Sequence, residues 1–475
     1  MRTPIYTALQ NYRRRHNWRL HMPGHAGCAR GLPSGLKSLA AWDFTELPGL
    51  DDWHAPWGII QESEKLLAEA CGAAGARWLV NGSSSGLMAA LTGQFNEQSR
   101  VLLPRNAHRS VLSGLIWSGA WPVYAPVTLD HYGLQQQPTA AVWATVCAKY
   151  DDIDGLLLTS PDYYGIPAEV AAFKTLAATR GAVLIVDEAH GSHFSFSGLY
   201  PPSALDSGAD IVVQGWHKNL PVFNQGGALL WNLPRRQAEK IQLTLSNLTT
   251  TSPSYPLLAS LDWARAYMLS TEGQALMQRA WELAQHYRRK IQTLPGLYLY
   301  GSDREFGSTD PLKCFIILDK VQLTGYQAAS ILQQRFHIDI ELAQEQGILA
   351  MFSLFHDQPA WEAFYQALSY LCRVYSAPAS RHTSKLTPPL PQVAMTPRQA
   401  VQAPSCKCYY RQAVHKVSAS MIIPYPPGIP CLIPGEVITE EIVDYLAEVQ
   451  TQVRHIQGGT FFTDGYLEVI ENDCS

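Results

Sequence analysis

The sequence predicts an α/β fold built on a mostly parallel β-sheet. From about residue 60 to residue 290, short apolar runs alternate with segments of helical periodicity, a pattern typical of a sheet covered by helices. Each apolar run ends in a cluster of polar residues. Because ligands bind beyond the carboxyl ends of the strands in open α/β sheets, the functional residues are expected where these runs end.

The expected elements divide the chain into four parts. In the large domain, residues 1–290, strands are expected at 76–80, 100–104, 155–161, 182–190 and 210–218. A smaller α+β domain is expected at 291–375, with strands at 312–319 and near 338–343 and a helix at 323–336. Residues 376–405 are rich in Pro, Ser and Gln, which predicts an extended linker, and residues 406–475 form a final unit.

Composition excludes several classes of function. The chain has 475 residues, is 47% hydrophobic and carries a formal net charge of -4, so it lacks the broad basic field that nucleic acids or anionic membranes attract. No apolar run is long enough to span a membrane, and the N-terminus lacks a signal-type apolar region. The nine scattered cysteines, including the CKC at 406–408, are expected to be ordinary thiols with no metal, which fits a cytoplasmic protein.

The stretch LVNGSSSGLMAA, residues 79–90, is a candidate phosphate site. It follows an expected strand and opens an expected helix, so Ser83, Ser84 and Ser85 would offer hydroxyls and backbone N–H groups at a helix N-terminus. The alternative is an ordinary serine N-cap beside a Gly-containing turn. The stretch lacks the lysine of a Walker loop, which disfavours nucleoside triphosphate hydrolysis.

The stretch LIVDEAHGSHF, residues 184–194, places Asp187 at the end of an apolar strand, facing the ligand side of the sheet. The aspartate could instead cap a helix, or bind a metal together with Glu188, His190 and His193. No second cluster with the spacing of metal ligands supports the metal interpretation.

Lys218 lies in the mostly apolar stretch 211–230. A lysine near the interior is neutralised, paired with an acid or used as a nucleophile, although an isolated one more often buries only its stem. A phosphate cradle, a strand-end aspartate and a lysine together describe a site for pyridoxal phosphate, whose aldehyde forms a Schiff base with lysine. His108, in the stretch 102–114, could stack on the cofactor ring, or could be a loop or N-cap histidine.

Eight motifs, in order along the chain, resemble those of one family. They are HMPGH (21–25), the segment 43–73, NGSSSG (81–86), PRNAHRSV (104–111), SPDYYG (160–165), VDEAHGSHF (186–194), GADIVVQGWHK (208–218) and IPYPPGIPCLIPGEVI (423–438). The chain resembles the fold-type-I pyridoxal phosphate decarboxylases that act on ornithine, lysine or arginine, especially the shorter bacterial members.

The resemblance implies a large domain like that of aspartate aminotransferase, a smaller α+β domain and a C-terminal α+β domain. It also implies a homodimer or larger even assembly that converts a basic amino acid to an amine and CO2. By this resemblance, Lys218 would bond to the cofactor, Asp187 would pair with its pyridine nitrogen and His108 would stack on its ring. Ser83 and Ser84 would bind the phosphate with help from Ser85, and His190 would also contact the cofactor. His217 would position catalytic groups, and Glu436 would recognise the basic side chain of the substrate.

Four positions depart from the family pattern. Gly215 and Trp216 stand where the family usually has Ser-Thr, so a hydroxyl that helps to hold the phosphate is missing. Asn224 replaces a threonine, and Ala26 replaces a lysine. Two alternatives stay open. An aminotransferase or carbon–sulfur lyase shares the aspartate and lysine but ordinarily needs an arginine for the substrate α-carboxylate. Gly215 and Trp216 also leave open a non-catalytic relative.

Overall fold

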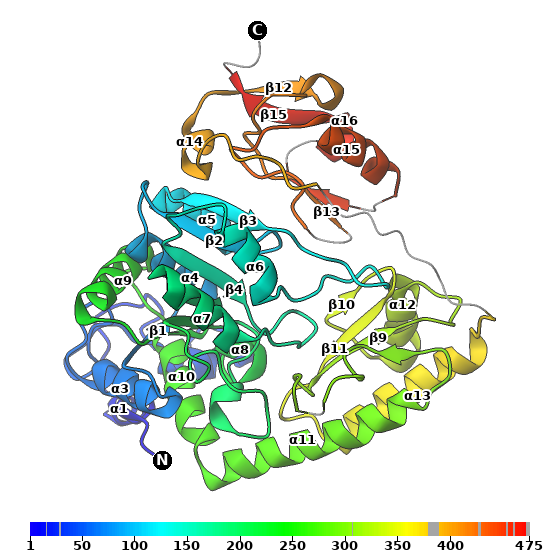
Figure 1. Cartoon of the computed structure of the whole chain (residues 1–475). Coiled ribbons are helices and arrows are strands. Elements are labelled where there is room, and N and C mark those ends of the chain that lie inside the picture. The colour runs from blue at the N-terminus through cyan, green and yellow to red at the C-terminus, as the bar shows by residue number, and fades with distance from the viewer. Residues whose placement is uncertain are drawn as a thin grey trace.

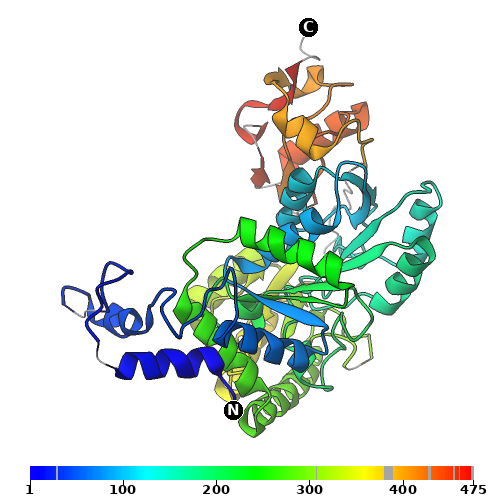
Figure 2. The same ribbon diagram turned by 90° about the vertical axis from the view of Figure 1, so that its left-hand side faces the viewer.

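The computed structural model describes residues 1–15, 17–27, 30–305, 307–378, 389–425, 429–452, 455–458 and 461–471. Its centre is a seven-stranded sheet covered by helices, with a smaller sheet domain on one side and the C-terminal part above (Figure 1). The N-terminal helices project to one side of this body (Figure 2).

The large sheet has the order β1-β7-β6-β5-β4-β2-β3. Its strands are β1 (Gly75–Leu79), β2 (Arg100–Pro104), β3 (Trp121–Ala125), β4 (Gly155–Thr159), β5 (Val183–Asp187), β6 (Ile211–Gln214) and β7 (Gly227–Trp231). Strands β2 to β6 pair in parallel, whereas β7 runs antiparallel to both β1 and β6. The predicted mostly parallel sheet is confirmed.

Two strands of this sheet, β3 and β7, were not among the five expected from the sequence. Strand β3 lies at the sheet edge, where the missing N–H of Pro122 breaks no pairing in the interior of the sheet. The expected strand 210–218 is too long, because its last residues form the short helix α8 (Trp216–Asn219).

Helices pack over this sheet in two groups. Helix α4 packs on α5 and α9 over β1, β6 and β7, while α6 and α7 pack on each other over β3, β4 and β5. The bounds are α4 (Gly82–Gln94), α5 (Arg109–Ser118), α6 (Ala140–Cys147), α7 (Val170–Arg180), α9 (Arg235–Leu248) and α10 (Tyr255–Met268).

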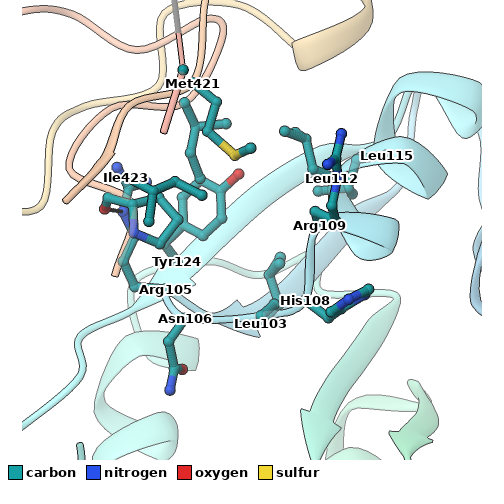
Figure 3. A pocket seen from close by; sticks show the side chains of 14 residues that line it. Leu103, Arg105, Asn106, His108, Arg109, Leu112, Leu115, Tyr124, Met421 and Ile423 are labelled. Carbon is teal, nitrogen blue, oxygen red and sulfur yellow. Dashed lines mark hydrogen bonds between the residues drawn. The ribbon is translucent and has the colours of Figure 1, made fainter. Parts of the chain in front are cut away.

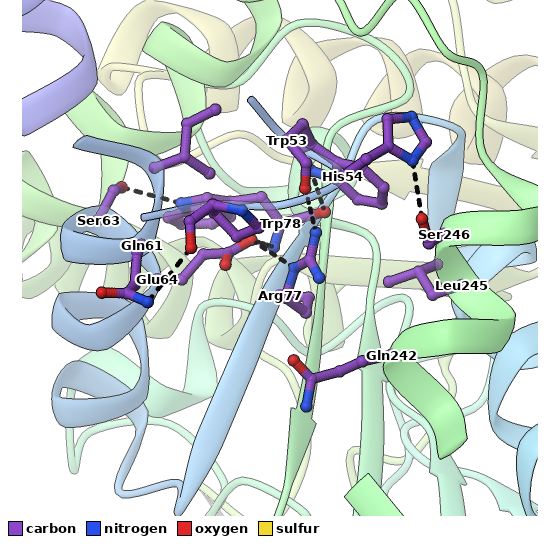
Figure 4. A network of polar contacts seen from close by, with 12 residues as sticks. Trp53, His54, Gln61, Ser63, Glu64, Arg77, Trp78, Gln242, Leu245 and Ser246 are labelled. Carbon is purple, nitrogen blue, oxygen red and sulfur yellow. Dashed lines mark hydrogen bonds and ion pairs between the residues drawn. The ribbon is translucent and has the colours of Figure 1, made fainter. Parts of the chain in front are cut away.

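The N-terminal part consists of α1 (Pro4–Arg14), α2 (Ser34–Trp42) and α3 (Ile59–Cys71). A buried polar network joins α3 to β1 (Figure 4). Arg77 pairs with Glu64 (Nε to Oε1, 2.9 Å) and donates to the carbonyl oxygen of Trp53 at 2.6 Å. The indole of Trp78 donates to Ser63 at 2.9 Å. Each buried polar group in this network therefore has a partner, as stability requires.

The smaller domain has an antiparallel four-stranded sheet of order β10-β11-β9-β8. Its elements are α11 (Thr271–Gln292), β8 (Tyr298–Leu299), β9 (Lys313–Ile317), α12 (Gly325–Phe336), β10 (Leu342–Ala343), β11 (Gly347–Met351) and α13 (Gln358–Val374). The expected strand at 338–343 is shortened to the two residues of β10. This domain shares one continuous apolar core with the large domain.

The C-terminal part has its own apolar core. It contains α14 (Pro397–Gln402), β12 (Ser405–Tyr409), β13 (Ile423–Tyr425), α15 (Glu440–Gln452), β14 (His455–Gln457), α16 (Phe461–Asp464) and β15 (Tyr466–Ile470). Strand β12 pairs with β15 and β13 with β14.

Two expectations about this part need correction. The extended linker expected at 376–405 contains helix α14, which begins with a capping box between Thr396 and Gln399; residues 379–388 lie outside the described residues. Within CKC, Cys408 is a free thiol as expected, but Cys406 is disulfide-bonded. No helix in the described ranges is both long and apolar enough to cross a membrane.

Candidate active site

Lys218 lies on α8, directly after strand β6. Its Nζ is 3.0 Å from Nε2 of His190. Burial lowers the pKa of Lys218, an effect opposed by the carboxylates of Asp187 and Glu341. A lowered pKa increases the fraction of neutral amine near neutral pH, which is the form that attacks a carbonyl carbon.

Asp187 is the last residue of β5, the strand that pairs in parallel with β6. It is only 3% exposed, and its Oδ1 accepts a hydrogen bond from the backbone N–H of Ala189 at 3.1 Å. Burial raises the pKa of Asp187, against the opposing effects of His108 and Lys218. A buried carboxylate with so few donors favours the approach of a cationic group.

His108 is the N-cap residue of α5. Its Nδ1 accepts from the backbone N–H of Ser110 at 3.3 Å and lies 2.7 Å from the Ser110 hydroxyl oxygen. Burial lowers the pKa of His108, which favours the neutral imidazole that can stack on an aromatic ring. The N-cap role and the ring-stacking role therefore do not exclude each other.

One cavity of about 560 Å³ joins these residues. Among the predicted site residues, its lining includes Ser83, His108, Asp187, His190 and Lys218. They come from the start of α4, the start of α5, the end of β5, the loop that follows β5, and α8. Residues that follow or end different strands thus meet at the carboxyl edge of the sheet, as the strand pattern predicts.

Four other predicted site residues do not line this cavity. The ring of His217 bonds through Nδ1 to the carbonyl oxygen of Gly226 at 2.9 Å. The Ser85 hydroxyl is turned back to the carbonyl oxygen of Gly82 at 2.8 Å, and Ser84 lies on the first turn of α4. Ser83 is therefore the serine of this group whose placement fits a phosphate contact.

Glu436, the fourth, is fully buried at the junction with the C-terminal part. It forms a two-pronged ion pair with Arg105, in which Nη2 and Oε2 are 2.7 Å apart, and it also accepts from the backbone N–H of Ile433 at 2.8 Å. Its carboxylate is thus saturated by partners within the chain, and the structure offers no support for a contact with substrate.

The unusual pair Gly215 and Trp216 has a structural explanation. A Cβ at Gly215 would lie 2.9 Å from the carbonyl oxygen of Ala189, so a larger residue would force the strand-end loop to move. Trp216 is fully buried, packs edge-on against Trp78 and donates to Gln214 at 2.9 Å. Its side chain supports α8 from the core side and supplies no phosphate ligand. Asn224 is exposed, and Ala26 adopts a positive φ of 48°.

The acidic and histidine groups near Asp187 serve other contacts. Glu188 accepts from Gln214 at 2.7 Å and from the backbone of Ala204 at 2.6 Å, and burial raises its pKa to about 8. His193 lies 3.3 Å from Asp310, and both are buried. In the part of the chain that the structure describes, no three His, Cys, Asp or Glu side chains gather as metal ligands would.

Sequence reasoning missed two residues beside this cavity. Tyr163 packs its ring edge-on 4.9 Å from that of His190, and its hydroxyl donates to Glu341 at 2.5 Å. Tyr163 lies in the motif SPDYYG, which carried the resemblance without a role for any residue. Glu341 had no signal of its own, because it comes from the smaller domain, 178 positions away from Tyr163.

The cavity fits pyridoxal phosphate in chemistry as well as position. Ser83 and the N-terminus of α4 suit the phosphate, Asp187 the pyridine nitrogen, His108 the ring face and Lys218 the aldehyde. A solved structure of SPT with PLP matches this fold over 66% of this chain and 76% of that chain, with a TM-score of 0.53 and 16% identity. Fold and site thus fit the fold-type-I class of pyridoxal phosphate enzymes.

Within that class, the chain belongs to the Orn/Lys/Arg decarboxylase family. The family's major domain matches residues 3–300, and its C-terminal domain matches residues 380–473. An arginine decarboxylase of Bacillus subtilis (strain 168) is 34% identical over 481 residues, which cover 99% of this chain and 98% of that protein. The structure of the E. coli constitutive lysine decarboxylase has a TM-score of 0.82 at 20% identity, covering 99% of this chain and 82% of that one. The predicted decarboxylase of basic amino acids is confirmed.

Replacing Glu436 separates its structural role from substrate recognition. Glu436→Gln leaves the buried guanidinium of Arg105 without its counter-charge, which is expected to lower the free energy of unfolding by about 3–5 kcal/mol. The KM for substrate is expected to stay unchanged. Urea unfolding and steady-state kinetics measure the two quantities, with the exposed Glu468→Gln on β15 as the control. If Glu436→Gln instead left the stability unchanged and raised the KM, Glu436 would be a substrate-binding residue.

Proposed function

We propose that this chain decarboxylates arginine, using pyridoxal phosphate bound through Lys218. The observation that carries the proposal is the single cavity in which Lys218, Asp187, His108 and Ser83 meet. These four side chains match the aldehyde, ring nitrogen, ring face and phosphate of the cofactor.

When bound, pyridoxal phosphate supplies a conjugated ring that takes up the electron pair released as CO2 leaves. Asp187 would hold a proton on the ring nitrogen, because its buried carboxylate favours an adjacent positive charge. His108 would cover one face of the ring and keep water from it. The start of α4 and Ser83 would fix the phosphate and thereby orient the ring.

Lys218 is also the best-placed proton donor for the α-carbon after CO2 leaves. Its Nζ faces the cavity and lies 3.0 Å from His190, a histidine whose pKa is lowered well below its ordinary value by burial. His217 is not placed for this role, because its Nδ1 is used by the carbonyl of Gly226 and the side chain does not line the cavity.

The cavity lining favours decarboxylation over transamination. Among the described residues that line the cavity there is no arginine to grip the substrate α-carboxylate. Leu342 and Ala343 lie there, together with uncharged polar side chains such as Gln135 and Gln137. A carboxylate without an ionic partner in such surroundings gains by leaving as neutral CO2.

Glu341 is our candidate for the acid that meets the guanidinium group of the substrate. It is exposed, directly precedes the cavity-lining Leu342, and accepts a hydrogen bond from the cavity-lining Tyr163. Burial lowers the pKa of Lys218, and the Glu341 carboxylate acts in the opposite direction, raising it. A carboxylate can accept two parallel N–H bonds from a guanidinium, a geometry that an ammonium cannot match. The named arginine decarboxylases among the relatives, which match nearly the whole chain, support arginine over lysine.

We also infer that the chain acts as a homodimer. Trp18, Leu20 and Met22 in the N-terminal segment are 93%, 95% and 66% exposed. A second copy would cover these apolar side chains, which a monomer would leave in water.

Light scattering is expected to give twice the mass of the chain, and Leu20→Glu is expected to reduce the measured mass toward that of one chain. The mass of a single chain for the parent protein would contradict the inference.

Product analysis tests the proposed reaction. With pyridoxal phosphate and equal concentrations of arginine, lysine and ornithine, the purified protein is expected to release CO2 fastest from arginine. Borohydride reduction is expected to fix the cofactor on Lys218, as shown by peptide mapping. Lys218→Ala should lose both label and activity, while Lys240→Ala on the exposed side of α9 should retain them. A label on another lysine, or faster release from lysine or ornithine, would refute the proposal.

Replacing Glu341 tests how the substrate side chain is recognised. Glu341→Gln is expected to raise the KM for arginine by about tenfold or more, because a charge-assisted hydrogen bond is lost. The kcat should fall less, since Glu341 does not line the cavity that contains Lys218 and Asp187. Glu345→Gln, four positions on, is the matched control, because it is Glu341 and not Glu345 that accepts the hydrogen bond from Tyr163. Equal KM values for both variants would exclude Glu341 from substrate recognition.

A further inference from the structure

A second cavity, of about 360 Å³, lies between the large domain and the C-terminal part. Met421 and Ile423 form one wall, and Leu112 and Leu115 on α5 form the other (Figure 3). His108 lines both this cavity and the one that contains Lys218. The two cavities therefore lie on either side of the loop that joins β2 to α5.

Tyr124 on the edge strand β3 is the first sign that this cavity takes a ligand. The residue is 7% exposed, and its hydroxyl has no hydrogen-bond partner among the described residues. In Figure 3 its ring lies beside Ile423, and its hydroxyl oxygen points toward the gap between Met421 and α5. Burial raises the pKa of Tyr124, with a further contribution from Glu436, so the hydroxyl keeps its proton and can donate. A buried hydroxyl without a partner is costly, and a ligand acceptor would satisfy it.

Arg109, on the first turn of α5, supplies charge to the same cavity. Its guanidinium is exposed and forms no ion pair with any residue that the structure describes. The other arginine of the lining, Arg105, is already neutralised by Glu436. A basic amino acid or its amine product would meet Arg109 as a like charge, so this cavity does not suit the substrate.

We propose that this cavity is a binding site for an amphiphilic carboxylate, with its anionic head between Arg109 and Tyr124 and its apolar body between α5 and Met421. Both free polar groups are donors, so they select an acceptor, and the guanidinium selects a negative one. The aliphatic side chains of the walls favour a hydrocarbon tail on the ligand, and the cavity volume of about 360 Å³ limits the length of that tail. The bound molecule would contact the loop that carries His108.

Titration with octanoate tests this site in the full-length protein. Calorimetry is expected to show saturable binding of one octanoate per chain, and no binding of octylamine, which has the same chain length and the opposite charge. Tyr124→Phe and Arg109→Gln are each expected to weaken binding by about tenfold, because each removes a donor to a charged acceptor. Tyr124→Phe removes only a hydroxyl that has no partner, so the fold is expected to be kept.

Tyr445→Phe is the matched control, because Tyr445 also has a buried hydroxyl without a partner among the described residues but does not line the cavity. Arg236→Gln, exposed on α9, is the control for the lost charge. Both controls should bind octanoate as the parent does. The proposal is overturned if octanoate does not bind, if octylamine binds equally well, or if Tyr124→Phe and Arg109→Gln bind octanoate as tightly as the controls.

Discussion

The site depends on one electrostatic constraint: a carboxylate and an amine are withdrawn from water at the ends of two neighbouring parallel strands. Asp187 ends β5 and Lys218 follows β6, and the parallel pairing of these strands brings both side chains to the same edge of the sheet. Burial raises the pKa of the first and lowers that of the second. Burial thus disfavours each charged form, and an aromatic cation with an aldehyde group would relieve both costs.

This arrangement requires a rigid support beneath α8. Trp216, one residue after Gly215, packs against Trp78, and its indole N–H donates to Gln214, which in turn donates to Glu188 beside Asp187. The buried pair of Glu64 and Arg77 lies next to Trp78 in the same network (Figure 4). The lysine and the aspartate are therefore linked through the core as well as through the cavity. Where the resemblance implied a hydroxyl for the phosphate, Trp216 thus supplies a core contact.

The sequence predicted functional residues that directly follow strands, but it could not predict side-chain contacts between residues that are far apart along the chain. Asp187, Lys218 and His108 could be predicted because each follows a local pattern of apolar strand and polar end. Glu341 and Tyr163 could not, since their contact joins two domains and neither has a local signature. For Glu436, the resemblance predicted a contact with the substrate side chain, but its partner Arg105 lies 331 positions away, and only the tertiary structure shows the carboxylate already occupied. The capping box that begins α14 was readable from Thr396 and Gln399, and the composition of the surrounding segment obscured it.

The loop after β2 ties the C-terminal part to the active site. Arg105 is held by Glu436 and by the carbonyl oxygen of Pro430, both from the C-terminal part, and three residues later His108 faces the cofactor cavity. Between these residues the chain has little freedom, because Arg105 is fixed at one end and His108 caps α5 at the other. The C-terminal part is therefore tied, through Arg105 and this short segment, to the residue His108 that lines the cavity. The buried ion pair thus anchors the segment that carries His108, although neither of its charges touches the cavity that contains Lys218.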